Sequence, residues 1–398
     1  MGWDGSVRKS RDILVSLGAG WDLEEELLRD GKETKLNVAE LAQPATTATQ
    51  IAIVDVLRAQ GIRPQAVVGH SSGDIAAAYT AGYMSHRAAI EVSFARGRVT
   101  SLAKTRCLVP GAMMSVGLGE HEIAPYMKDM TKGALSIACV NSPSNVTVSG
   151  DAEAMDELAG RLAASGDGVF HRRLVVDTAY HSHHMQAVAD EYCRILSDQQ
   201  QPSEEDQVHG QEEGITLVSS VTGSLKASNF SPEYWTTNLV STVRFCDAVQ
   251  FLVRKRASDT TSSDGLVIIE VGPHPALAGP VRQSIAGLDK NTTPEFTYYA
   301  TLQRKKGAVE SMLALASHLL ESGVRLNFDH VSALTTGFHE ANVLSGLPSY
   351  AWDHSIKHWH ESRISREYRM RRDPYHDLLG VRTADSTSLG PRWRLKNY

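Results

Sequence analysis

Apolar positions recur at two different spacings along this 398-residue chain, and the changes of spacing divide it into segments. Helical periodicity dominates the first part, and a short apolar run then predicts a strand that turns into an Ala-rich helix. The elements expected there are a helical region over residues 1–60 with a loop at Gln43-Pro44, a helix from Thr46 to Ala59, a strand at Gln65–Val68, a helix at Asp74–Thr80 closed by Gly82, and a helix at about His86–Val99.

Residues 111–177 have a different pattern, in which short alternating runs flank two amphipathic stretches. The expected elements are strands at Ala112–Val116, Leu135–Val140, Asn145–Ser149 and Val169–Val176, with helices at His121–Met127 and Ala152–Ala164. This β-α-β-β-α-β order predicts a small ferredoxin-like α+β subdomain inserted into a larger core.

Strand and helix signals continue after the insert, interrupted by two polar segments that predict surface loops. The expected elements are a long helix from His183 to about Leu196, a loop over 197–214, a strand at Ile215–Ser220, a helix at about Phe245–Arg254, a loop over 255–265, a strand at Leu266–Val271, and a helix at about Ala308–Ser322.

The composition mainly argues against certain partners, metal sites and cellular locations. A net charge of −6 gives no reason to expect a nucleic acid or a membrane surface as partner. The four cysteines form no C-x-x-C pair, which favours free thiols in a reducing compartment over disulfides or a zinc site. The N-terminal residues contain no apolar core of a signal peptide, and no apolar run is long enough to span a bilayer. These features predict a cytoplasmic protein.

The segment Gly69-His70-Ser71-Ser72-Gly73 matches the G-x-S-x-G nucleophile elbow. In such an elbow a strand turns sharply into a helix, and small residues two before and two after the serine avoid clashes. The Ser71 hydroxyl is then exposed at a helix N-terminus, where the Ser72 N–H and the helix dipole stabilise an oxyanion. The alternative is a glycine-rich turn without chemistry, but the strand before it and the helix after it favour the elbow.

An arginine falls on the apolar face of the helix expected at 86–99. Ala89, Val92, Arg96 and Val99 are spaced by three, four and three residues, so they share one face. A buried guanidinium needs an anionic partner, and no acidic residue on that face supplies one. Two interpretations remain open from periodicity: Arg96 binds a substrate carboxylate, or it forms a structural salt bridge with a distant acid.

A nucleophilic serine needs a general base, and the densest group of histidines is Tyr180-His181-Ser182-His183-His184. One of these histidines could be the base, the cluster could have no role, or it could bind a metal. The H-x-H-H spacing has no accompanying ligand set of a recognised kind, so we predict no metal.

At this point the chain resembles the acyltransferase domain of polyketide and fatty-acid synthases, and more narrowly that of fungal highly reducing polyketide synthases. GHSSGDIAAAYTAG resembles the family's elbow, with Asp74 where Glu is commoner, and Arg96 has the family's spacing of twenty-five residues after the serine. The resemblance implies an α/β fold: an α/β-hydrolase-like core with a parallel sheet, plus the ferredoxin-like insert.

The resemblance also implies roles for further residues. The run from Val176 to Ser182 resembles the segment with the catalytic histidine, which selects His181. The family orients this histidine with a main-chain carbonyl, and the matching position is Asn238. Candidate pocket residues are Gln43, His70, Asn141 and Tyr180.

Domain boundaries follow from the same resemblance. The core is expected at 1–110 and 178–330 and the insert at 111–177. Residues 331–373 resemble the linker after the acyltransferase, and residues 374–398, with Pro374-Tyr375-His376-Asp377, resemble an incomplete start of the dehydratase hotdog domain. Family members begin with a strand and a G-Q-G-x-Q loop that donates a second oxyanion N–H. Nothing before Asp12 resembles it, so we expect this first core strand to be missing.

The function implied is transfer of malonyl from malonyl-CoA, through an ester on Ser71, to the phosphopantetheine thiol of an acyl carrier protein. No cofactor is expected in the domain itself, and ketosynthase and dehydratase domains are the expected neighbours. The bulky Tyr180 before the base favours malonyl over a branched unit. Two alternatives remain: a weak or inactive fragment with a structural role, and an α/β-hydrolase or thioesterase, which would need an Asp or Glu to complete a triad.

Overall fold

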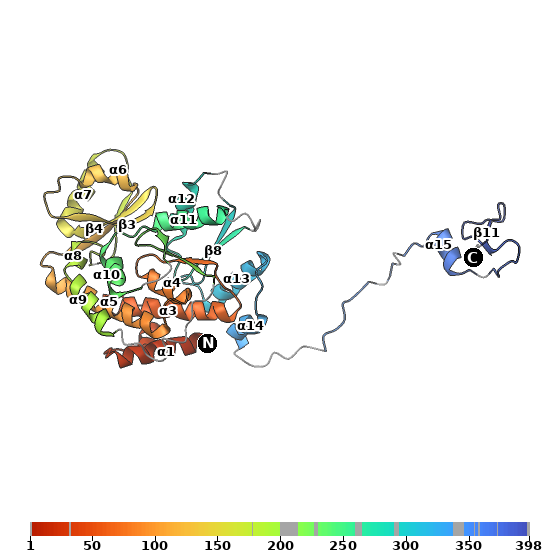
Figure 1. Cartoon of the computed structure of the whole chain (residues 1–398), viewed down its shortest axis with the longest axis horizontal. Helices are drawn as coiled ribbons and strands as arrows, with labels where there is room; N and C mark the ends of the chain where they lie inside the picture. The colour runs from red at the N-terminus through yellow and green to blue at the C-terminus, as the bar shows by residue number, and fades with distance from the viewer. Residues whose placement is uncertain are drawn as a thin grey trace. The chain divides into compact units, whose positions relative to one another are not determined.

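The computed structural model describes residues 2–31, 33–176, 178–199, 214–226, 230–258, 265–289, 294–336, 346–353, 355–356, 359–371 and 373–395. The chain forms two compact units, Met1–His339 and Glu340–Tyr398 (Figure 1). In the described part of the chain, no helix is both long and apolar enough to cross a membrane. All four cysteines are free thiols.

The boundary expected at residue 331 is too early. Helix α14 (Phe328–Thr336) lies in the first unit, where it contacts α13 (Ala308–Glu321). Leu334 of α14 packs against the buried cluster that includes Leu315 of α13, so this part of the expected linker belongs to the core. The second unit begins at Glu340, and the boundary expected at residue 373 stays a prediction. That residues 374–398 begin a dehydratase domain stays a prediction.

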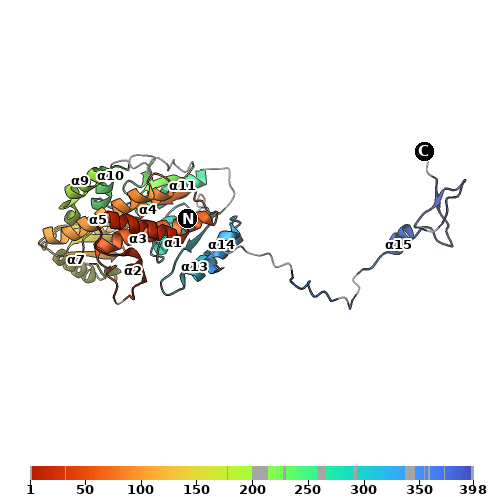
Figure 2. The same ribbon diagram turned by 90° about the horizontal axis from the view of Figure 1, so that it is seen from below.

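Three helices form one wall of the first unit. Helices α1, α3 and α5 contact one another and lie side by side in Figure 2. A side chain at Gly97 of α5 would place its Cβ 2.8 Å from the Ala39 carbonyl oxygen of α3, so these two backbones nearly touch. The N-terminal helices are α1 (Trp3–Ser16), α2 (Leu23–Leu28), α3 (Ala39–Ala59), α4 (Gly73–Thr80) and α5 (His86–Arg106).

The loop expected at Gln43-Pro44 is wrong, because α3 continues through Pro44. A proline inside a helix removes one backbone hydrogen bond and normally disfavours the helix. Here the flanking turns bury Ala45, Ala48 and Ile51 in the main apolar cluster. Tertiary packing therefore outweighs the local preference.

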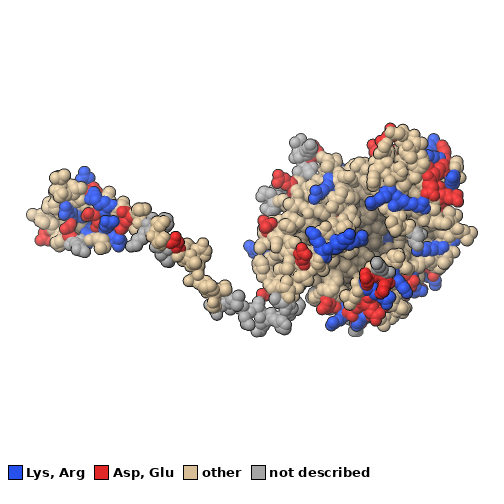
Figure 3. All heavy atoms as spheres, turned by 180° about the vertical axis from the view of Figure 1, so that it is seen from behind, with Lys and Arg blue, Asp and Glu red and all other residues tan. Residues whose placement is uncertain are grey.

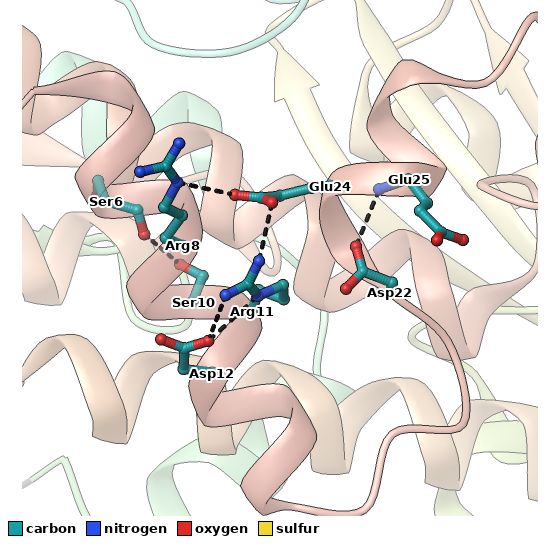
Figure 4. A network of polar contacts seen from close by, with 8 residues as sticks. All are labelled: Ser6, Arg8, Ser10, Arg11, Asp12, Asp22, Glu24 and Glu25. Atoms are coloured by element: carbon teal, nitrogen blue, oxygen red, sulfur yellow. Dashed lines mark hydrogen bonds and ion pairs between the residues drawn. The ribbon is translucent and has the colours of Figure 1, made fainter.

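Polar contacts join α1 to the short helix α2 (Figure 4). Arg11 Nη1 donates to Glu24 Oε2 at 2.9 Å, and Arg8 Nε lies 3.6 Å from Glu24 Oε1. Asp22 caps α2 by accepting from the Glu25 N–H at 3.0 Å. This network fixes the path of the chain between the two helices.

We expected a parallel sheet in the core, and among the described residues the core strands form two small sheets, each with one parallel pair. In the first, β1 (Ala66–Val68) pairs in parallel with β6 (Thr216–Ser219), which pairs antiparallel with β7 (Ser224–Leu225). In the second, β8 (Leu266–Glu270) pairs in parallel with β9 (Phe296–Ala300). No ladder joins β1 to β8 among the described residues, and every side chain of both strands is only half-buried.

The insert has the predicted order of elements. Its four strands form one antiparallel sheet in the order β3-β4-β2-β5, and α6 and α7 each contact this sheet. Its last strand is shorter than expected. The elements are β2 (Gly111–Val116), α6 (Glu120–Met127), β3 (Leu135–Ser142), β4 (Asn145–Asp151), α7 (Ala152–Ala164) and β5 (His171–Arg173).

The long helix expected after His183 is broken into two helices, α8 and α9. The sequence also did not predict several short helices and strands that follow them, such as α10 and α12. Of the expected polar loops, residues 200–213 and 259–264 lie outside the described residues. The remaining elements are α8 (His183–Gln186), α9 (Ala189–Gln199), α10 (Pro232–Val240), α11 (Phe245–Ser258), α12 (Ala278–Ala286) and, in the second unit, α15 (Arg363–Arg369), β10 (Val381–Arg382) and β11 (Trp393–Arg394).

Candidate active site

Ser71 lies in the sharp turn between β1 and α4. Its φ is 57°, a left-handed conformation that is strained for a residue with a side chain. A Cβ on Gly69 would lie 2.1 Å from the Asp74 nitrogen, so glycine is required two residues before the serine. The matching requirement after the serine is wrong: the corresponding position on Gly73 has no heavy atom within 4 Å.

Ser72 is the N-cap residue of α4. Within the described residues its backbone N–H has no hydrogen-bond partner. A free N–H at a helix N-terminus, next to the nucleophile, has the position of an oxyanion donor.

His181 is the histidine of the cluster that contacts the serine. Its Nε2 lies 2.6 Å from Ser71 Oγ, and its Nδ1 lies 2.8 Å from the carbonyl oxygen of Ser241. A carbonyl only accepts, so Nδ1 carries the proton and Nε2 presents a lone pair to the serine hydroxyl. His181 is itself strained, with a φ of 57°.

The orienting carbonyl expected at Asn238 is therefore wrong; it belongs to Ser241. Helix α10 ends at Val240, and the chain then leaves the helix, which frees the Ser241 carbonyl from the helical pattern. The resemblance placed the carbonyl three residues too early, inside the helix.

Burial and the nearby Arg96 charge lower the pKa of His181 to about 3. The imidazole is therefore neutral at ordinary pH, which is the protonation state that a general base needs.

Arg96 lies on the buried face of α5, as its periodicity predicted, with its residue 0% exposed. Its Nη2 donates to Ser71 Oγ at 3.3 Å and its Nη1 donates to Asn238 Oδ1 at 2.8 Å. Burial lowers the pKa of Arg96. In the described part of the chain its hydrogen bonds go to neutral groups, which favours the carboxylate-binding interpretation over a structural salt bridge.

Asp74 is a buried carboxylate beside the nucleophile that sequence reasoning gave no role. Its Oδ2 accepts from Asn238 Nδ2 at 3.2 Å, from Ser220 Oγ at 2.8 Å and from the Tyr234 hydroxyl at 3.2 Å. Burial raises the pKa of Asp74 to about 6 although these hydrogen bonds oppose the shift. Its position directly after the elbow was the available signal.

Of the four other candidate pocket residues, His70 and Asn141 are hydrogen-bonded to each other, with His70 Nε2 2.8 Å from Asn141 Oδ1. Burial lowers the pKa of His70. Gln43 has a buried Oε1 that no described residue hydrogen-bonds. Tyr180 packs against two apolar clusters and interacts electrostatically with Arg96.

His183 and His184 point away from the serine, toward Asp151 at the end of β4. Their Nε2 atoms lie 2.9 and 2.8 Å from the same oxygen, Asp151 Oδ1, while Asp151 Oδ2 accepts from the Ala134 N–H at 2.8 Å. All three ligand atoms lie within 4.8 Å of one another. Hydrogen bonding accounts for this geometry, and the absence of a metal stays a prediction.

The Asp151 contacts connect the insert to the segment that directly follows His181. We expect Asp151→Asn to lower the free energy of unfolding by about 1–3 kcal/mol, because an amide has one acceptor oxygen and cannot accept from both the histidines and the Ala134 N–H. Chemical denaturation followed by circular dichroism measures this. Asp156→Asn is the control, because the Asp156–Arg173 pair is exposed and should be worth less than about 1 kcal/mol. Equal effects of the two substitutions would contradict the expectation.

The space-filling view shows a hollow in the surface of the first unit, with Lys and Arg side chains on both sides of it (Figure 3). The nucleophile, its base and Arg96 come from three separate segments of this unit, at the elbow, after the insert and on α5. Together they have the arrangement that serine acyl transfer requires, with a buried cation beside the candidate nucleophile.

Comparisons with known proteins give the family of this chain. Residues 6–325 match the family described as "Acyl transferase domain". The chain is 56% identical over 394 residues to "Highly reducing polyketide synthase 17" of Metarhizium anisopliae, covering 98% of this chain and 13% of that protein. It is 48% identical over 394 residues to "Highly reducing polyketide synthase sdnO" of Sordaria araneosa, covering 98% and 12%.

Solved acyltransferase domains have the same fold. One is the domain from module 8 of the salinomycin polyketide synthase, with a TM-score of 0.68 and 29% identity over 82% of this chain and 71% of that one. Another, of SpnD, was solved in complex with 2-(pent-4-yn-1-yl)malonyl, with a TM-score of 0.64 and 26% identity over 83% of this chain and 71% of that one.

The chain spans about an eighth of the length of these two curated relatives. It belongs to the acyl transferase family, as an acyltransferase-domain segment of the fungal highly reducing polyketide synthases.

Proposed function

We propose that this segment moves a malonyl group from malonyl-CoA, through an ester on Ser71, to the phosphopantetheine thiol of an acyl carrier protein. The observation that carries the proposal is the contact of Arg96 Nη2 with Ser71 Oγ at 3.3 Å. A guanidinium this close to the nucleophile suits an acyl group that ends in a carboxylate, which it can bind through two hydrogen bonds.

In the first half-reaction, His181 Nε2 takes the proton of the Ser71 hydroxyl as its oxygen attacks the thioester carbonyl. The Ser72 N–H donates to the oxyanion that forms. His181 then returns the proton to the departing sulfur of coenzyme A, which leaves malonyl esterified to Ser71. The Ser241 carbonyl keeps the imidazole in the required tautomer throughout.

In the second half-reaction, the thiol of the carrier protein's phosphopantetheine gives its proton to His181 and attacks the ester. The Ser71 oxygen leaves and regains a proton from His181. No cofactor in this chain takes part. Ketosynthase and dehydratase domains are its proposed neighbours in a longer cytoplasmic synthase, as the lengths of its relatives suggest.

The choice of malonyl over a branched unit rests on Tyr180. This side chain is partly buried between two apolar clusters and interacts electrostatically with Arg96, so its bulk lies near the proposed carboxylate site. The malonyl derivative bound by the SpnD domain supports a carboxylated acyl group in general.

The hydrolase alternative has less support. His181 Nδ1 contacts a carbonyl oxygen, whereas the triad of an α/β-hydrolase would orient the histidine with a carboxylate. The remaining alternative is a catalytically weak or inactive synthase fragment with a structural role.

Brief mixing with malonyl-CoA followed by intact-protein mass spectrometry tests the proposal. We expect one malonyl adduct on the wild-type chain and none on Ser71→Ala, because Ser71 contacts both an imidazole base and a buried guanidinium. No adduct on a folded wild-type chain would reject the proposal for this segment. An adduct that persists in Ser71→Ala would reject the assigned nucleophile.

A further inference from the structure

Arg96 is a buried cation that is hydrogen-bonded to the neutral side chain of Asn238. Its Nη1 donates to the amide oxygen of Asn238 at 2.8 Å, and its Nε is buried with no hydrogen-bond partner among the described residues. Leaving a guanidinium in the interior without an anion costs several kcal/mol, so this arrangement needs an explanation.

A carboxylate is available one side chain away. Asp74 is 0% exposed, and its Oδ2 lies 3.2 Å from the Asn238 nitrogen Nδ2. Asn238, 2% exposed, therefore stands between the two opposite charges and contacts both. The Asp74 carboxylate is also held by donors from Ser220 and Tyr234.

The amide of Asn238 can take only one orientation. Arg96 has donors and no acceptor, so the amide oxygen must face it. Asp74 Oδ2 and the Ser71 carbonyl oxygen, which lies 3.2 Å from Nδ2, accept hydrogen bonds, so the amide nitrogen must face them. A carboxylate at this position could satisfy Arg96, but when ionised it has no donor for the other two.

We propose that Asn238 is a specificity-determining residue that keeps Asp74 from pairing with Arg96, so that the Arg96 charge is available to an acyl carboxylate. The amide holds the guanidinium in place with one neutral hydrogen bond, which is weaker than an ion pair and leaves part of the guanidinium free. This inference rests on the proposed function, since it assigns the anion that Arg96 awaits to the substrate.

The central experiment is Asn238→Asp, which puts a carboxylate against Arg96 Nη1. We expect kcat/KM for acylation of Ser71 by malonyl-CoA to fall about a hundredfold or more, because the substrate must displace a buried charged partner. Acylation by acetyl-CoA has no such competitor and should change less than about tenfold, so the malonyl-to-acetyl ratio falls. A residue with a merely structural role would lower both rates equally.

Thr237→Asp is the matched control, because it adds the same charge one residue earlier on α10 at an exposed position. It should leave the malonyl-to-acetyl ratio unchanged. If Asn238→Asp fails to fold by circular dichroism, Asn238→Ala replaces it. That variant removes the spacer and lets Arg96 approach Asp74, so the same fall in the ratio is expected.

Binding of free malonate, measured by calorimetry with acetate for comparison, gives a readout that does not need turnover. We expect the wild-type chain to bind malonate and Asn238→Asp to lose that binding at least tenfold. An unchanged malonate affinity, or an unchanged ratio in both Asn238 variants, would overturn the inference and leave the proposed function standing. A wild-type chain that neither binds malonate nor forms a malonyl adduct would overturn both.

Discussion

Replacing His181 by alanine is expected to slow acylation of Ser71 by about a hundred- to ten-thousandfold, the range that a positioned general base contributes. The imidazole lies 2.6 Å from the serine oxygen, and burial keeps it neutral, so its loss leaves the hydroxyl without a proton acceptor. The measurement is the rate of malonyl adduct formation in rapid-quench mass spectrometry.

His183→Ala is the control for this experiment. It also removes an imidazole, two residues further along, but that side chain contacts Asp151 and not the serine. Its rate should stay within about threefold of wild type, the scale of a surface change away from the reacting atoms. Equal losses in the two variants would mean that the cluster acts through the fold and that His181 is not the base.

Replacing Arg96 by alanine is expected to reduce acylation by malonyl-CoA by about a hundred- to thousandfold, while acylation by acetyl-CoA is kept or increases. The reason is that the malonyl carboxylate would be buried without its charged partner, which costs about 3–5 kcal/mol. Acetyl has no carboxylate and loses nothing comparable. Competition between the two thioesters in one reaction, read by adduct mass, measures the ratio directly.

Arg98→Ala is the matched control, because it lies on the same helix with an exposed side chain. It should leave the ratio of the two adducts unaltered. If Arg96→Ala lowers both acylation rates by the same factor, the guanidinium positions Ser71 and does not bind the acyl carboxylate.

The candidate nucleophile, cation and base could each be selected from the sequence because each has a local or family signal. Ser71 has a short motif with a strand before it and a helix after it. Arg96 falls on an apolar helical face, and the structure buries it there. His181 required the resemblance, since neighbouring histidines were equally good candidates by sequence alone.

The contacts that hold these groups in place could not be predicted, because they join residues far apart in the chain. Asn238 reaches Arg96 and Asp74 across 142 and 164 residues. The sequence offered one weak signal for Asn238. It lies on the buried face of α10 with Trp235 and Leu239, where an apolar side chain is usual and an amide is not. The Ser241 carbonyl has no sequence signal, because its availability depends on where α10 ends.

The division of the core into two sheets was also missed, since the sequence signal of a strand does not say with which other strand it pairs.

The two sheets have a consequence for the behaviour of this chain in concentrated solution. In the described part of the chain, β1 and β8 each have only one hydrogen-bonded neighbour, so their other edges carry backbone groups without a ladder. Such edges can recruit strands from other molecules. Self-association of the isolated segment through the edges of β1 and β8 is therefore expected to increase with protein concentration.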